Sequence, residues 1–181
     1  MGKLLDYFFG RKERVVVPEK PTLDEAWLSS NFTLRWIHRL EAWEITTDQY
    51  QKAKGKKTDE DTILALYKTL IAKHRSKPVV LQSLYYELAM MHAELGKDAK
   101  WYLQQSHTAI LEQYKKNKNV RSVVIENAGR DSCQSCKKLD GWLLTLREAE
   151  KKKVLPNKKC TKKHGKIAFC RCMYGPMKNI R

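Results

Sequence analysis

The sequence predicts an α+β protein, mainly α, in which a bundle of four to five helices precedes a small β-hairpin-rich module. Apolar residues recur three and four positions apart through much of residues 21–119, which is the spacing of one face of a helix. After residue 120 short β-branched runs replace this pattern, and all five cysteines lie in this part of the chain. We therefore expect an N-terminal segment and linker at 1–20, a helical domain at 21–119 and a cysteine-bearing module at 120–181.

The first twenty residues predict a short amphipathic segment and an extended linker. Val17 and Lys20 each precede a proline, which disfavours helix. The segment lacks the apolar core and cleavage site of a secretory signal, and Asp6 stands where the myristoylation pattern requires Ser or Thr. We expect the segment to dock on the protein body. No apolar run approaches the roughly 18 residues of a transmembrane helix, so we expect no membrane span. The five cysteines are expected to be reduced thiolates gathered on a metal, which predicts a cytoplasmic location.

The helical domain is predicted to begin at a capping box formed by Thr22 and Glu25. A helix or helix pair then runs to about Glu44, and its aromatic residues are interpreted as core anchors. The polar run from Asp48 to Asp61 is predicted to be a loop.

Three consecutive antiparallel helices are predicted after this loop. The first begins at Thr58 or Asp59, where acidic residues suit the positive end of the helix dipole. The second begins near Pro78 and ends at Gly96, which suits the position after a helix. The third follows from Asp98 and ends in a lysine-rich run.

The module at 120–181 predicts short strands around one helix. The β-branched run from Val120 predicts a strand, and residues 142–146 predict a returning strand. Thr145 and Glu148 form a second capping box, which opens a short charged helix. Residues 164–174 predict a strand of a hairpin that turns at a glycine.

The cysteine spacing predicts a structural zinc site. In a Cys-x-x-Cys loop such as Cys133 to Cys136, two thiolates converge on one ion while backbone N–H groups bond the sulfurs. Cys160 supplies a third ligand. Cys170 and Cys172 lie on one face if their segment is extended, so either of them, or both, can reach the ion. The sequence therefore predicts a helical bundle followed by a small module whose loops are held together by a zinc ion.

Several alternatives to four cysteine ligands bear on this site. His164 has a plausible zinc spacing from Cys160, so a Cys-Cys-Cys-His set stays open. A disulfide framework is disfavoured, because the cysteine number is odd and there is no secretory signal. A redox site is not expected, because Cys133 is not predicted to open a helix in a βαβ unit. A thiolate-rich set predicts a closed structural ion, since catalytic zinc keeps a position open for water.

One set of residues in the tail matches a known pattern: Cys133-x-x-Cys136, Leu139-Asp140-Gly141, Pro156 and Cys170-Arg171-Cys172. On these residues the tail resembles the C-terminal zinc-binding segment of the phage Mu F-like minor head (head morphogenesis) proteins. The resemblance covers about forty residues and implies a structural zinc knuckle in a phage or mobile-element setting. That family has His-Pro-Asn before its Cys-Arg-Cys, whereas this chain has Ile167-Ala168-Phe169 and an additional Cys160.

Positive charge concentrates in the same module. Residues 131–181 hold 14 Lys and Arg against four Asp and Glu, a net charge of +10 out of +16 for the chain. Such a concentration attracts phosphate backbones, although a solvated lysine face is the alternative. The leading hypothesis is a non-enzymatic protein whose module binds nucleic acid, DNA or RNA, through ten basic residues: Lys137, Lys138, Lys151, Lys152, Lys153, Lys158, Lys159, Lys162, Lys163 and Arg171.

A second hypothesis is a protein-interaction or assembly component, associated with a phage head or portal, in which the helical domain docks to a partner. An enzyme is not expected. The sequence shows no Ser/His/Asp set, phosphate loop or HNH-like histidine pattern, and no paired carboxylates stand beside the cysteines. We therefore expect no small-molecule substrate.

Overall fold

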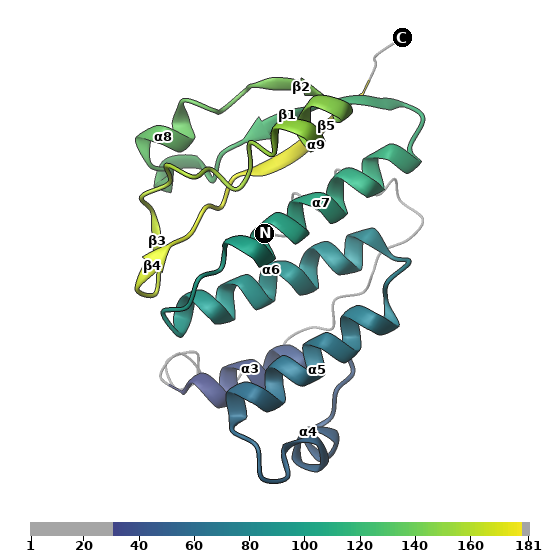
Figure 1. Ribbon diagram of the computed structural model, residues 1–181, viewed down its shortest axis with the longest axis vertical. Coiled ribbons are helices and arrows are strands. Elements are labelled where there is room, and N and C mark those ends of the chain that lie inside the picture. The colour runs from purple at the N-terminus through teal and green to yellow at the C-terminus, as the bar shows by residue number, and fades with distance from the viewer. Residues whose placement is uncertain (1–30, 179–181) are drawn as a thin grey trace. The chain divides into compact units, whose positions relative to one another are not determined.

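The computed structural model describes residues 31–178 and confirms the predicted fold class, mainly helical with a small antiparallel sheet near the C-terminus (Figure 1). The predicted N-terminal segment at 1–20 and the capping box of Thr22 and Glu25 lie outside the described residues. Within 31–178, no helix combines the length and apolarity needed to cross a membrane. The elements follow in the order α3 (Phe32–Glu41), α4 (Thr47–Lys54), α5 (Asp59–Lys73), α6 (Pro78–Glu94), α7 (Lys100–Lys116), β1 (Val120–Glu126), η1 (Gly129–Asp131), α8 (Gln134–Lys137), β2 (Leu143–Thr145), α9 (Leu146–Lys152), β3 (Lys163–His164), β4 (Ile167–Ala168) and β5 (Met173–Lys178).

The chain divides into two compact units, residues 1–66 and 67–181, and the boundary falls inside α5. In the second unit, α7 contacts β1 and β5, and α6 contacts β3 and β4. The two long helices therefore belong to the same compact body as the C-terminal strands.

In the first unit, α4 corrects the loop predicted from Asp48 to Asp61. The helix is opened by a capping box in which the Thr46 hydroxyl accepts from the Gln49 backbone N–H, at 3.2 Å, and the Gln49 side chain accepts from the Thr46 N–H, at 2.9 Å. Two otherwise unpaired backbone donors are thereby satisfied. Tyr50 is buried, which anchors the short helix. The sequence prediction weighed the polar composition of this run and missed its cap.

Asp59 links the elements of this first unit. Its carboxylate accepts hydrogen bonds from Thr33 Oγ1, at 2.8 Å, and from the Tyr50 hydroxyl, at 2.7 Å. It also pairs with Lys54 Nζ at 2.6 Å. The bond from Lys54 and the bond from Tyr50 hold the pKa of Asp59 below its usual value. The residue predicted to start α5 thus also ties α3 and α4 to it.

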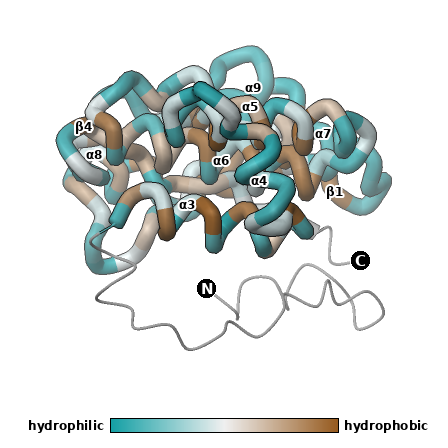
Figure 2. Tube along the Cα trace, turned by 90° about the horizontal axis from the view of Figure 1, so that it is seen from below, coloured by the Kyte–Doolittle hydropathy of each residue, from teal (hydrophilic) through white to brown (hydrophobic). Residues whose placement is uncertain are grey.

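In the second unit, α6 and α7 form the main apolar core, and both match the predicted helices. Hydrophobic segments lie along both helices and along β1, while the connecting loops are largely hydrophilic (Figure 2). Gly96 follows α6 with φ +73°, a conformation that glycine adopts without strain. The side chains fully or almost fully buried between these helices and their neighbours are Leu84, Leu88, Ala89, Met91, Ala93, Leu103 and Leu111.

The sheet has the order β2-β1-β5 and is antiparallel throughout. Both α7 and α9 contact it, as Figure 1 shows. The inward residues Val123, Ile125 and Leu144 are buried. Tyr174 secures β5, because its carbonyl accepts from the Tyr114 hydroxyl, at 2.9 Å, and its own hydroxyl accepts from a backbone N–H, at 3.2 Å.

The predicted glycine-turned hairpin is present as β3 and β4, which pair on either side of Gly165. A Cβ at Gly165 would lie 2.7 Å from the Ala93 carbonyl oxygen, so only glycine fits against the end of α6. Phe169 follows β4 and is buried, with its ring 5.6 Å from that of Tyr86. The hairpin therefore rests on α6, and the chain then passes the last two cysteines before joining the sheet as β5.

Candidate metal centre and basic hollow

The five cysteines come from three separate loops that the fold brings together. Cys133 immediately precedes α8 and Cys136 lies within it, Cys160 lies between α9 and β3, and Cys170 and Cys172 lie between β4 and β5. All five are free thiols. Cys133 is half-buried and the others are buried.

The sulfur atoms form two groups that share Cys136. In the first, Cys133, Cys136 and Cys160 have sulfurs within 4.8 Å of one another, and in the second Cys136, Cys170 and Cys172 do. The Cys133 and Cys160 sulfurs are 3.9 Å apart, and those of Cys136 and Cys170 are 4.0 Å apart. Four thiolates in a tetrahedron at zinc–sulfur distances of about 2.3 Å lie roughly 3.8 Å from one another. The cluster is therefore compatible with a bound metal ion.

Polar groups around the cluster point hydrogen-bond donors at the sulfurs. The Ser135 hydroxyl lies 3.2 Å from the Cys133 sulfur. The Asn157 backbone N–H donates to Cys170, at 3.3 Å, and its side-chain amide donates to Cys136, at 3.4 Å. Such donors stabilise the thiolate and orient it, as the groups behind metal ligands commonly do.

The pKa values of the thiols follow these contacts. Burial opposes ionisation of Cys133, but its hydrogen bonds with Ser135 and with two backbone N–H groups outweigh burial and lower its pKa to about 5. The Cys172 thiol donates to Cys170, which lowers the pKa of Cys170 to about 6 and raises that of Cys172. Burial raises the pKa of Cys160 and of Cys136. Thiolate character thus occurs in both groups of sulfurs.

His164 takes another position. It lies in β3, where its Nε2 is 3.4 Å from a Glu94 carboxylate oxygen and its ring is 5.3 Å from that of Phe169. Neither cysteine group found within residues 31–178 includes it. Cys170 and Cys172, by contrast, both belong to the second cysteine group.

Cys133 was predicted not to open a helix in a βαβ unit; it is the residue before the four-residue helix α8. Its backbone carbonyl accepts from the N–H of Cys136 and of Lys137. The neighbouring strands are antiparallel, so the surrounding unit is still not βαβ. This helical turn brings the Cys133 and Cys136 sulfurs into the same group.

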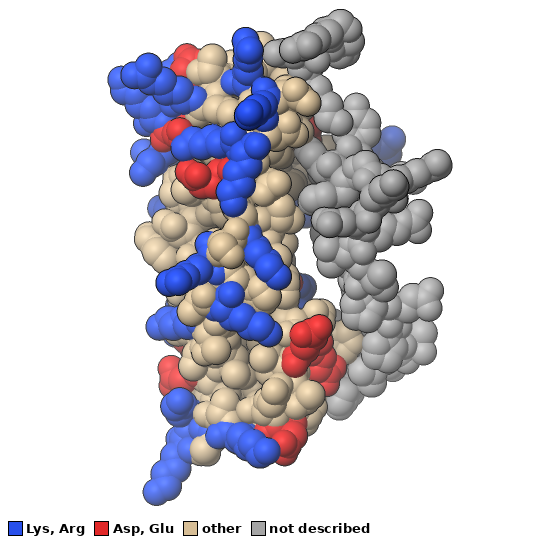
Figure 3. All heavy atoms as spheres, turned by 90° about the vertical axis from the view of Figure 1, so that its right-hand side faces the viewer, with Lys and Arg blue, Asp and Glu red and all other residues tan. Residues whose placement is uncertain are grey.

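Eight of the ten predicted basic residues are exposed. The other two, Lys162 and Arg171, are partly buried and lie 3.8 and 3.7 Å from the carboxylate of Asp131. In Figure 3, Lys and Arg side chains lie along the visible face from top to bottom, and Asp and Glu form smaller patches among them.

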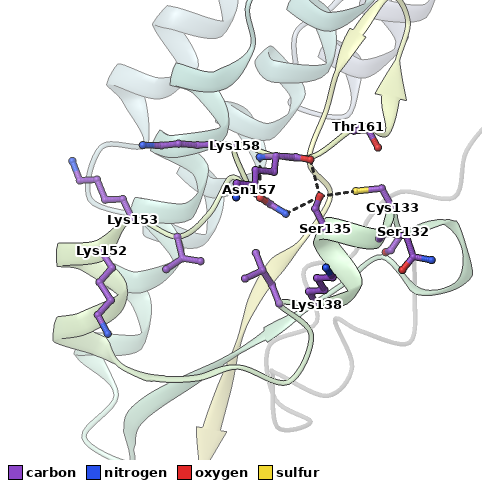
Figure 4. A pocket seen from close by; sticks show the side chains of 13 residues that line it. Ser132, Cys133, Ser135, Lys138, Lys152, Lys153, Asn157, Lys158 and Thr161 are labelled. Atoms are coloured by element: carbon purple, nitrogen blue, oxygen red, sulfur yellow. Dashed lines mark hydrogen bonds between the residues drawn. The ribbon is translucent and has the colours of Figure 1, made fainter.

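A hollow of about 990 Å³ lies beside the cysteine cluster. In Figure 4, Lys152, Lys153 and Lys158 lie on one side of it, and Ser135 and Cys133 lie on the opposite side. Among the described residues, its lining includes no Asp or Glu. The lining consists of five lysines, Lys138, Lys152, Lys153, Lys158 and Lys159, and of Ser132, Cys133, Gln134, Ser135, Leu139, Val154, Asn157 and Thr161.

Five of the ten predicted basic residues line the hollow, and the other five do not. The sequence prediction treated all ten as one set and did not include the polar lining residues Ser135 and Asn157. Ser135 lies inside the Cys-x-x-Cys loop and Asn157 follows Pro156, three residues before Cys160. Both residues lie between predicted metal ligands in the sequence, and this position could have indicated that they lie near the cysteine cluster.

Comparison of the chain with protein-family models, with curated proteins and with solved structures finds no match.

Proposed function

We propose that the protein is a non-enzymatic zinc-binding protein whose basic C-terminal module binds nucleic acid. The observation that carries the proposal is the convergence of five thiols from three loops, directly beside a lysine-rich surface. Thiolate-rich tetrahedral sites favour zinc, and a set without water or a carboxylate ligand suits a closed structural site. The hydrogen-bond donors on the sulfurs support the same assignment.

Zinc in this position would act as a structural link between loops. Cys133 and Cys136 belong to the segment after β1, whereas Cys170 and Cys172 belong to the segment before β5. An ion held by both segments and by Cys160 would fix three loops at one point. Small modules commonly use a metal in this way, because they cannot build a sufficient apolar core.

Zinc analysis of the reduced protein and of cysteine variants tests the metal assignment. We expect about one zinc per chain in the wild type and a loss of zinc in Cys136→Ser, because Cys136 belongs to both sulfur groups. Cys170→Ser and Cys172→Ser should each retain zinc, since the other thiol can serve as fourth ligand. The double variant should lose it. Less than about half a zinc per chain in the folded wild type would contradict the proposal.

Nucleic-acid binding is tested by the salt dependence of the affinity. Each phosphate contact made by a lysine releases counterions, so the affinity should fall steeply between 50 and 200 mM salt. Fluorescence anisotropy with labelled duplex and single-stranded oligonucleotides measures this. If no affinity is seen at low salt, or if it does not change with salt, the lysines are a solvated face. The assembly hypothesis is then favoured, and capture from the native host with and without nuclease would test it.

A further inference from the structure

We propose that the phosphate contacts are made in the lysine-lined hollow, defined by the lining residues given above, and that the metal-binding loops build its wall. This rests on the proposed function and narrows it. The ten basic residues would then contribute unequally, with Lys138, Lys152, Lys153, Lys158 and Lys159 as the phosphate-binding set.

The charge of the hollow lacks compensation from within the described part of the chain. Lys138, Lys153, Lys158 and Lys159 form no ion pair with any residue of 31–178, and no acidic residue of that range lines the space they surround. Lys152 pairs with Glu148 at 2.9 Å, on an exposed face of α9. Several like charges around one space repel one another, so an anion that enters it is favoured.

Outside the hollow the situation differs. Lys162 and Arg171 lie close to the Asp131 carboxylate, which partly satisfies both. Lys137, Lys151 and Lys163 are exposed but do not line the hollow. They contribute to the general field of the module without enclosing a ligand.

The wall opposite the lysines is tied to the cysteine sulfurs. The Ser135 hydroxyl lies 3.2 Å from the Cys133 sulfur and donates to the Lys159 carbonyl oxygen at 2.7 Å. The Asn157 amide donates to Ser135 at 3.3 Å (Figure 4). It also donates to the Cys136 sulfur at 3.4 Å. These bonds join the loops that carry Lys138 and Lys159. An ion that fixes the thiols would therefore also fix the distance between the two sides of the hollow.

The lining chemistry favours a nucleic-acid backbone. Ammonium and hydroxyl groups recognise phosphate, and the lining has no aromatic side chain on which a base could stack. The volume of about 990 Å³ is at the upper end of the range of roughly 300–1,000 Å³ usual for ligand sites. Contacts of this kind position a backbone without reading its sequence. We therefore expect little sequence preference.

Two matched triple variants of the zinc-loaded full chain test this inference. The first, Lys138→Gln/Lys153→Gln/Lys158→Gln, removes three charges from the hollow. The second, Lys137→Gln/Lys151→Gln/Lys163→Gln, removes three exposed charges outside it, so the change in net charge is the same.

Anisotropy with a labelled oligonucleotide of about 20 nucleotides compares the two. The hollow variant should weaken binding at least tenfold at about 100 mM salt and reduce the salt slope by about two to three, whereas the control should weaken it less than threefold. Zinc content and circular dichroism check that both variants fold. Equal losses in the two variants would overturn the hollow as the site while leaving nucleic-acid binding intact. A wild type that does not bind would overturn the proposed function itself.

Two further arms distinguish the source of the phosphate and the role of the metal. Inorganic phosphate should displace the oligonucleotide no better than chloride of equal ionic strength, and displacement at low millimolar phosphate would instead identify a site for free phosphate. After zinc is removed, the difference between the two triple variants should vanish. If it persists, the wall does not depend on the metal.

Discussion

The helix pair α6–α7 and the loops that carry the cysteines differ in what holds them together. In the helix pair, aliphatic side chains such as Leu84, Leu88 and Leu103 are almost fully buried, and each contributes roughly 1.5–3 kcal/mol through the apolar surface it removes from water. Between residues 133 and 172, four of the buried side chains are cysteines, and the large apolar ones are Leu144, Leu155 and Phe169. The first region is held by apolar packing, and in the second we expect bonds from thiolates to a metal ion to add to a smaller apolar core.

This difference also bears on the charge of the two regions. Several lysines surround the cysteine cluster, and their mutual repulsion opposes a compact arrangement of the loops. A metal ion held by thiolates can fix such loops without apolar side chains that would occupy the surface. The lysines then remain free to meet a ligand.

Metal removal should separate the two regions most clearly. Treating the reduced protein with a strong zinc chelator should unfold or loosen the cysteine-bearing segments 133–139 and 157–172, because structural zinc contributes an apparent 10–16 kcal/mol or so in small zinc modules. The helices α6 and α7 should remain, since their core contains no cysteine. Hydrogen exchange measures both regions at once, and zinc added back should restore protection. Unchanged protection across the segments 133–139 and 157–172 would show that these loops are stable without the ion.

A cavity in the helix pair should have the converse effect. Leu88 is 0% exposed, so Leu88→Ala should lower the free energy of unfolding by about 2–5 kcal/mol in urea. Zinc content should not change. Leu143→Ala is the matched control, because Leu143 is 60% exposed and its truncation should change stability by less than about 0.5 kcal/mol. Similar losses in the two variants would contradict the assignment of the core.

Acid should destabilise the junction between α7 and β5. His107 is buried against the Tyr174 ring, at 5.6 Å, and burial lowers its pKa to about 4. As the pH falls from about 6.5 to 4, the unfolded chain binds this proton before the folded one does, so stability is constant above about 6.5 and declines within this window. His107→Leu should remove the decline.

Urea unfolding of the wild type and of His107→Leu at pH 7 and pH 4.5 checks this. The wild type should lose about 2–3 kcal/mol more than the variant over this range. Using the difference between the two proteins cancels the protonation of the cysteines, which affects both alike. An equal pH dependence in the two proteins would show that His107 is not the titrating group.

The long helices could be predicted from the sequence more readily than the short helix α4. Helices α5, α6 and α7 were predicted because apolar periodicity and local signals such as Asp59, Pro78 and Gly96 report directly on helix formation. Helix α4 was missed because it follows its cap at Thr46 with a run of polar residues. Apolar periodicity identifies a long helix with many buried side chains, but it does not identify a short helix in which only Tyr50 is buried.

The candidate metal centre was predictable in part for a related reason. Cys133 and Cys136 are neighbours, so their joint role was visible from spacing, whereas the position of Cys160 against them depends on how two loops fold. The alternative ligand His164 could be set aside only once its contact with Glu94 was known. The hollow was not predicted at all, because Lys138 and the lysines of residues 152–159 come from different segments that only the fold brings together.

The smallest effect is expected at the cap of α9, the helix that connects the sheet to the hollow. The Thr145 hydroxyl accepts from the Glu148 N–H at 3.2 Å, and the Glu148 carboxylate accepts from the Thr145 N–H at 3.0 Å. Thr145→Ala removes the first bond and should cost about 1 kcal/mol in urea unfolding of the zinc-loaded protein, while Thr145→Ser should cost much less. Because Lys152 ends this helix and lines the hollow, the alanine variant should also raise hydrogen exchange around Lys152 without changing zinc content. A loss of zinc in this variant would mean that α9 and the metal loops form one cooperative unit, and the contrast between packed and metal-held regions would then have to be drawn elsewhere.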